Sequence, residues 1–100
     1  MTTDKTSQVQ RVLTTLEVLC GFAERGASNK DLCEATGHAA PQVSRDMAEL
    51  IAYGWARKSD ETGRFFLLPR FAQLSFKVAA DFESAARRLD DRKHAMTGGY

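Results

Sequence analysis

Gln42 and Arg45 lie three positions apart in a segment with helical spacing. Glutamine can pair with N6 and N7 of adenine, and arginine with O6 and N7 of guanine, at base-pair edges in the major groove. The other interpretation is that Arg45 binds a phosphate, or a carboxylate such as Asp46 or Glu49. Ser44, near the start of the segment, can reach a phosphate or only its own backbone. Base contact and phosphate contact are therefore the chemistry that these side chains offer.

A second group of cations lies on both sides of a predicted turn. Arg57, Lys58 and Arg64 form a local positive patch, which suits contact with backbone phosphates or entry into a minor groove. The alternative is a solvated edge strand that its charges keep from aggregating. Lys30, at the start of a predicted short helix, is a further candidate for phosphate contact.

Other kinds of site are not indicated. Cys20 and Cys33 are too few and too distant for a disulfide framework or a paired-cysteine zinc site, and their apolar neighbours indicate buried, reduced thiols. His38 and His94 have no ligand spacing with the cysteines, so neither a metal nor another cofactor is expected. No nucleophile and base pair, phosphate loop or carboxylate pair stands out. We therefore expect no catalytic residues and no enzyme.

The composition is that of one folded domain, with 100 residues, 43% hydrophobic, 27% charged, and 7 Gly and 2 Pro. Lys and Arg number 14 and Asp and Glu 13, and this net charge of +1 predicts no partner by itself. The polar residues 1–10 lack the apolar run of a secretory signal, and no stretch approaches the roughly 18 apolar residues of a membrane span. We expect a cytoplasmic protein without membrane contact.

The first element that must position these side chains is a helix over residues 7–25, ended by Gly26. Val18 and Phe22 form a second apolar strip on this helix, which predicts contact with another element or another subunit. The main apolar face comprises Val9, Val12, Leu13, Leu16, Leu19, Cys20 and Ala23.

Two further helices follow. Ser28 and Asp31 have the spacing of a capping box, which predicts a short helix over residues 29–35. Pro41 suits the first turn of a third helix over residues 40–53, since its missing N–H would have no partner there. The residues expected on its inner face are Val43, Met47, Leu50 and Ile51, and those expected to point outward are Pro41, Gln42, Arg45, Ala48 and Glu49.

Beyond Gly54 the apolar period changes to that of strands. Segments 55–59 and 64–68 flank the turn 60–63 and predict a β-hairpin. A long helix over residues 70–93 comes last, and at about 1.5 Å per residue it is longer than the preceding helices can cover. Its apolar stripe is Phe71, Leu74, Val78, Phe82, Ala85 and Leu89.

Helix, short helix, tight turn, helix and two-stranded ribbon is the order of a winged helix-turn-helix. The expected fold is therefore mainly α with a small β-hairpin and a long C-terminal helix. We predict a winged helix-turn-helix domain over residues 7–69, a helix over 70–93 that serves dimerisation or packing, and disordered tails over 1–6 and 94–100.

A family resemblance rests on a joined pattern of residues. The pattern comprises Val9-Gln10-Arg11-Val12-Leu13, Leu16, Leu19, Thr36-Gly37, Val43-Ser44-Arg45, Leu50, Gly54, the turn Asp60 to Gly63, Arg64-Phe65, Leu67 and Pro69-Arg70. Over about residues 8–76 it resembles the N-terminal DNA-binding domain of the IclR-type (isocitrate lyase regulator) transcription factors. The resemblance implies a winged helix-turn-helix that binds double-stranded DNA. Full-length members carry a second, effector-binding domain; the chain stops where the linker helix would lead into it, so no small-molecule effector is expected.

The sequence departs from the family pattern at two places. Ala39, Ala40 and Pro41 stand where the family has a polar start to its recognition helix, and they offer few hydrogen-bond donors. Asp46 stands where a leucine is usual. An acid there either pairs with a nearby arginine or faces the DNA, where it would oppose phosphate binding.

Two functional hypotheses follow. The first is a sequence-specific DNA-binding transcriptional regulator with helix 40–53 in the major groove and hairpin 55–68 on the backbone. It would be a homodimer through the first and last helices, reaching major grooves about 34 Å apart. In a monomer, the last helix would instead fold back over the first. The second hypothesis is a winged-helix module that docks on another protein, which the near-neutral charge and the start Ala39-Ala40-Pro41 favour.

Overall fold

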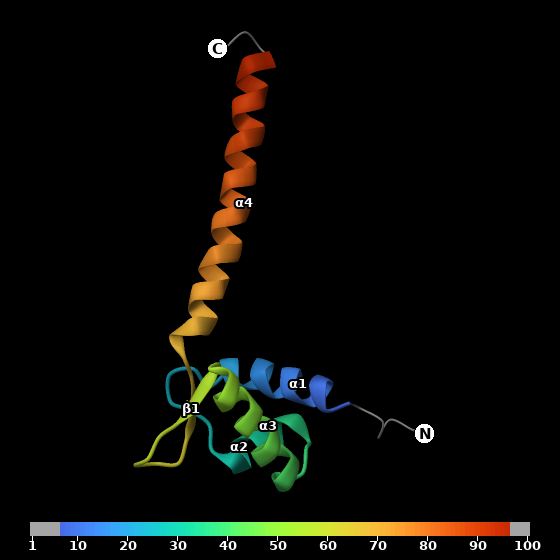
Figure 1. Ribbon diagram of the computed structural model, residues 1–100, viewed down its shortest axis with the longest axis vertical. Coiled ribbons are helices and arrows are strands. Elements are labelled where there is room, and N and C mark those ends of the chain that lie inside the picture. The colour runs from blue at the N-terminus through green and yellow to red at the C-terminus, as the bar shows by residue number, and fades with distance from the viewer. Residues whose placement is uncertain (1–6, 97–100) are drawn as a thin grey trace. The chain divides into compact units, whose positions relative to one another are not determined.

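The computed structural model describes residues 7–96 and confirms a mainly helical fold with one small hairpin. The chain divides after Arg70 into two compact units, the second of which is the remainder of the last helix. Residues 1–6 and 97–100, predicted as tails, lie outside the described residues. The elements are α1 (Gln8–Cys20), α2 (Asn29–Thr36), α3 (Ala40–Tyr53), β1 (Ala56–Lys58), β2 (Phe65–Leu67) and α4 (Pro69–Met96) (Figure 1).

The helix α1 is shorter than predicted. It begins with a capping box that the sequence analysis missed: the Ser7 hydroxyl accepts from the Gln10 N–H at 3.1 Å, and the Gln10 side chain accepts from the Ser7 N–H at 3.2 Å. It ends at Cys20 rather than at residue 25, because Gly21 caps it and residues 21–25 form turns.

One hydrophobic core lies where α1, α2, α3 and the hairpin meet. Its buried residues are Leu19, Ala27, Leu32, Val43, Met47, Leu50, Ala56 and Phe65. The helices pack pairwise against one another, and β1 and β2 lie against α3 and α1 respectively. The hairpin is therefore anchored to the helices by apolar contacts.

The face of α1 that meets this core differs from the predicted one. Val9 and Leu13 are 67% and 54% exposed, whereas Thr15 is fully buried. Val18 and Phe22, predicted to contact another element or another subunit, are half-buried and pack against the core of their own chain. The reason is that α2 and α3 both lie against α1, so the buried face is rotated away from the predicted one.

The capping box that opens α2 is confirmed. The Ser28 hydroxyl accepts from the Asp31 N–H, and the Asp31 carboxylate accepts from the Ser28 N–H, both at 3.0 Å. The hydrogen bond from the Ser28 N–H lowers the pKa of the Asp31 carboxyl, and the nearby Arg64 guanidinium lowers it further. A three-residue turn that begins with Gly37 in the left-handed conformation (φ 79°) leads to α3.

The helix α3 has the predicted bounds and ends at Gly54, which is also left-handed. Its buried face comprises Val43, Asp46, Met47 and Leu50. Ile51, predicted to point inward, is 37% exposed. The charged Asp46 occupies a core position instead, and the reason lies in a partner on α1.

The hairpin has shorter strands than predicted, three residues each, with Arg57 opposite Phe66 and Lys58 opposite Phe65. Ala27 adds a backbone bridge to Phe65. The adjacent Gly26 has φ 79°, and a Cβ atom there would lie 2.6 Å from the Phe66 ring. The hairpin can sit this close to the helices because residue 26 has no side chain.

Both cysteines are free and half-buried, rather than buried as predicted. Burial raises the pKa of the Cys20 thiol, and the nearby Glu17 carboxylate raises it further. The thiol form is therefore favoured at Cys20.

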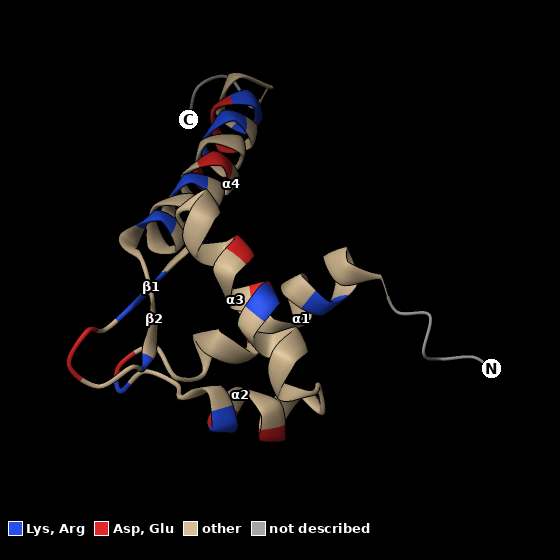
Figure 2. Ribbon diagram, turned by 60° about the horizontal axis from the view of Figure 1, so that its bottom comes forward, with Lys and Arg blue, Asp and Glu red and all other residues tan. Residues whose placement is uncertain are grey.

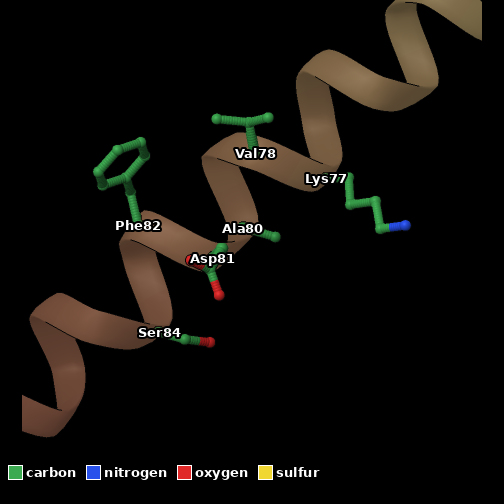
Figure 3. Close-up of a pocket in the computed structure, with 6 residues that line it drawn as sticks. All are labelled: Lys77, Val78, Ala80, Asp81, Phe82 and Ser84. Carbon is green, nitrogen blue, oxygen red and sulfur yellow. The ribbon is translucent and has the colours of Figure 1, made fainter.

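The second unit consists of α4 from Phe71 onward. The helix reaches Met96, beyond the predicted end at Lys93, so no tail begins at His94. Figure 3 shows Val78 and Phe82 projecting from the same side of α4 on successive turns, whereas Lys77 and Ser84 project from a different side. Val78 and Phe82 are 56% and 73% exposed. The hollow beside these side chains is lined by residues of α4 alone, so it is a feature of one helix surface.

Candidate nucleic-acid interface

The outward side of α3, the start of α2 and the hairpin enclose a groove of about 410 Å³. The residues that line it are Asn29, Ser44, Ala48, Ile51, Lys58, Gly63 and Phe65. None of these seven is acidic, and Lys58 is the cation among them. A groove with apolar walls and a cationic rim suits an anionic ligand with apolar features.

The polar side of the groove is held by a chain of hydrogen bonds. The Cys33 thiol donates to Asn29 Oδ1 at 3.3 Å, and Asn29 Nδ2 donates to Ser44 Oγ at 3.1 Å. The Ser44 hydroxyl therefore accepts a hydrogen bond from a side chain, whereas the sequence predicted contact with a phosphate or with its own backbone. Its own hydroxyl proton remains available to a phosphate. Asn29 was missed because its only signal in the sequence is its place directly after the Ser28 cap.

The strand β1 places its two cations on opposite faces of the hairpin. Lys58 lies in the groove, with its ammonium 5.6 Å from the centroid of the Phe65 ring. Arg57 lies over the Phe66 ring, with its Cζ atom 4.7 Å from the centroid. Both side chains belong to exposed residues, and the aromatic rings restrain them without neutralising their charge.

Arg45 is exposed on the outward side of α3, next to Ser44. Within residues 7–96 it forms no ion pair, so neither Asp46 nor Glu49 holds it. Gln42 is used differently from the prediction, since its Oε1 atom accepts from the Ala39 N–H at 3.3 Å and caps the start of α3. Arg45 is thus the more available of the two predicted base-contacting residues.

Asp46 is paired rather than facing outward. Its side chain is fully buried, and Oδ2 lies 3.3 Å from Nε of Arg11, whose side chain is 16% exposed. This ion pair joins α1 to α3 through the core. It removes the acid from the outward side of α3, so Asp46 does not oppose an anion there.

Arg64 also has a role within the fold. Its Nη1 atom donates to the Gly26 carbonyl at 3.0 Å and to Asp31 Oδ2 at 3.3 Å, and its side chain remains 40% exposed. Phosphate contact by Arg64 stays a prediction, and that contact would share a guanidinium that already fastens the hairpin to the start of α2.

The charges near the hairpin tip have both signs. The turn carries Asp60 and Glu61, both exposed, directly after the basic strand β1, so the tip is acidic and the strand behind it basic (Figure 2). Lys30 is exposed at the start of α2. The structure thus brings Ser44 and Lys58 to one groove, leaves Arg45 and Lys30 free at the surface, and engages Gln42 and Arg64 internally.

The arrangement of these elements has a match among solved structures. The crystal structure of Pseudomonas aeruginosa HmgR aligns with 69% of this chain at a TM-score of 0.63 and 23% sequence identity.

 

The fold is a winged helix-turn-helix. Because the matched part makes up 28% of the HmgR chain, the likeness concerns one portion of that protein. Comparisons with known protein families and with curated protein sequences find no match.

Two further observations concern residues 7–96. They contain no group of three or more His, Cys, Asp or Glu side chains placed to hold a metal ion. No helix in this part of the chain is both long enough and apolar enough to cross a membrane.

Proposed function

We propose that this protein is a sequence-specific DNA-binding transcriptional regulator. The outward side of α3 would enter the major groove, and β1 would contact the backbone beside it. The observation that carries the proposal is the groove between α3 and the hairpin, which has the cation Lys58 on its rim and no acidic residue in its lining. The HmgR structure shares this fold with the matched part of the chain.

The buried ion pair between Arg11 and Asp46 supports the same proposal. Asp46 would repel phosphates if it faced outward, and its burial removes this carboxylate from the vicinity of the exposed Arg45. The free guanidinium of Arg45 can donate to a guanine or to a phosphate.

The hairpin would bind by its strand rather than by its tip. Asp60 and Glu61 at the tip would be repelled by the phosphates that line a minor groove. Arg57 and Lys58, behind the tip, can reach phosphates without placing those acids between the strands of the duplex. Phosphate contacts by Ser44, Lys30 and Arg64 complete the proposal, with Arg64 as the most constrained of the three.

Selection of bound fragments from a random duplex pool tests the proposal with the full chain. We expect retention at low salt and enrichment of a sequence. Arg57→Ala and Lys58→Ala should each weaken binding to all sequences alike and reduce the slope of log K against log salt by about 0.9. Lys93→Ala, in the last turn of α4, is the matched control and should leave the slope unchanged. Failure to retain any duplex would contradict the proposal and support docking on another protein.

We further propose that the protein is a homodimer through α1 and α4. Val9 and Leu13 form the exposed apolar strip of α1, in place of the predicted strip of Val18 and Phe22. Within its own unit, the apolar stripe of α4 has no neighbouring element to cover Val78 and Phe82. Apolar surfaces of this kind mark contacts between proteins.

Sedimentation equilibrium at micromolar concentration tests the dimer, since one chain has a mass of 11.1 kDa. We expect about twice that mass for a two-fold dimer. Phe82→Glu should convert the dimer to a monomer, whereas Ala80→Glu, which lies off the stripe on the same helix, should not (Figure 3). A single-chain mass for the unchanged protein would contradict the dimer and favour α4 folding back over α1.

A further inference from the structure

We propose that Ala48 and Ile51 recognise thymine through its C5-methyl group, so that the preferred DNA sequence contains thymine at defined positions. This inference rests on the proposed function and concerns how the same groove reads sequence. Thymine is the base that presents a methyl group in the major groove, whereas the other base edges are distinguished by hydrogen-bond donors and acceptors.

The outward side of α3 has few groups that could read hydrogen bonds. Ala40, Pro41, Ala48 and Ala52 are exposed, and each lacks a polar side chain. Such side chains also let the helix backbone lie close to the bases. Of the α3 residues that line the groove, Ser44 is the one with a polar side chain, so base discrimination by Ala48 and Ile51 comes from apolar contact.

Ile51 lines the groove and its side chain is apolar. It is 37% exposed, so a ligand can reach it. Phe65, only 6% exposed, forms the apolar floor below it. Ala48 lies on the same helix one turn earlier and lines the same groove. These side chains provide an apolar surface for a methyl group.

The charges around this surface suit DNA as its occupant. Lys58, on the other side of the groove, can bind a phosphate and hold a DNA strand against the wall. The apolar grooves between α1 and α3 differ, because Glu49 lines both of them. Glu49 would repel a phosphate there, so the groove with Lys58 is the one that suits a thymine.

The test uses the full chain and a duplex recovered by the pool selection, in which each thymine is replaced in turn by uracil. Uracil pairs like thymine and lacks only the methyl group. We expect the unchanged protein to bind about fourfold more weakly for each thymine methyl that it contacts. In Ile51→Ala and in Ala48→Gly, uracil in place of the thymine that the changed residue contacts should no longer weaken binding.

Ala35→Gly is the matched control, because Ala35 is exposed on α2 and does not line the groove. It should keep the fourfold penalty for uracil. Equal binding of the two duplexes by the unchanged protein would overturn the inference while leaving DNA binding intact. A penalty that persists in both groove variants would also overturn it, since the methyl would then be read elsewhere. Absence of binding to any duplex would instead remove the proposed function itself.

Discussion

Replacement of Arg11 by methionine is expected to lower the free energy of unfolding by about 3 kcal/mol. The variant leaves the fully buried Asp46 carboxylate without its cation, and methionine cannot donate a hydrogen bond to Oδ2. A buried charge without compensation is far more costly than the loss of an exposed ion pair. Urea unfolding followed by circular dichroism measures the change, with an unaltered m value as the check that only stability has changed.

Two companion variants separate the charge from the packing. Asp46→Leu should cost less than Arg11→Met, because the 16% exposed Arg11 side chain can turn its charge toward water. The double variant Arg11→Met with Asp46→Leu should recover most of the stability, since an apolar pair can replace a buried ion pair. Equal destabilisation of Arg11→Met and of the double variant would show that the isolated carboxylate is not the cause.

Several features that depend on neighbouring residues could be predicted from the sequence, although the capping box of Ser7 and Gln10 was missed. The capping box of Ser28 and Asp31, the end of α3 at Gly54 and the hairpin around residues 60–63 all follow from local hydrogen bonding and backbone preference. These signals fix the order of the elements, and that order is sufficient for the fold class.

The side that each helix buries could not be predicted in the same way. Ile51 and Asp46 show the reason, because helical spacing alone places the isoleucine inside and gives no partner for the acid. The partner is Arg11, which lies 35 positions earlier in the sequence. Likewise, Val18 has an apolar side chain that suits either a dimer or a core, and only the packing of α2 and α3 against α1 decides between them.

The candidate site could be predicted only in part, because the partners of its side chains also depend on the packing. The exposure of Arg45 and Lys58 follows from the side of the element on which each lies. The engagement of Gln42 with Ala39, and of Arg64 with Gly26 and Asp31, depends on side-chain hydrogen bonds that spacing does not reveal. Long polar side chains can satisfy the fold or a ligand, and their residue type is the same in both cases.

Replacement of Arg45 by alanine is expected to lower DNA affinity by about fivefold to 150-fold, which corresponds to about 1 to 3 kcal/mol. Arg45 is exposed and forms no ion pair within residues 7–96, so the loss should fall on binding rather than on folding. If its guanidinium pairs with a guanine, Arg45→Ala also removes the preference at that position. Fluorescence anisotropy with the selected duplex and with single-base variants of it measures both effects.

Arg45→Lys distinguishes the two contacts that remain open for this side chain. Lysine keeps the charge but lacks the planar pair of donors that matches guanine O6 and N7. A base contact predicts that Arg45→Lys loses the preference for guanine, whereas a phosphate contact predicts that it restores most of the affinity. Glu49→Ala, an exposed change one turn later on α3, is the control and should not weaken binding. Unchanged affinity of Arg45→Ala for every duplex would contradict the placement of α3 in the major groove, because Arg45 is the exposed cation on its outward side.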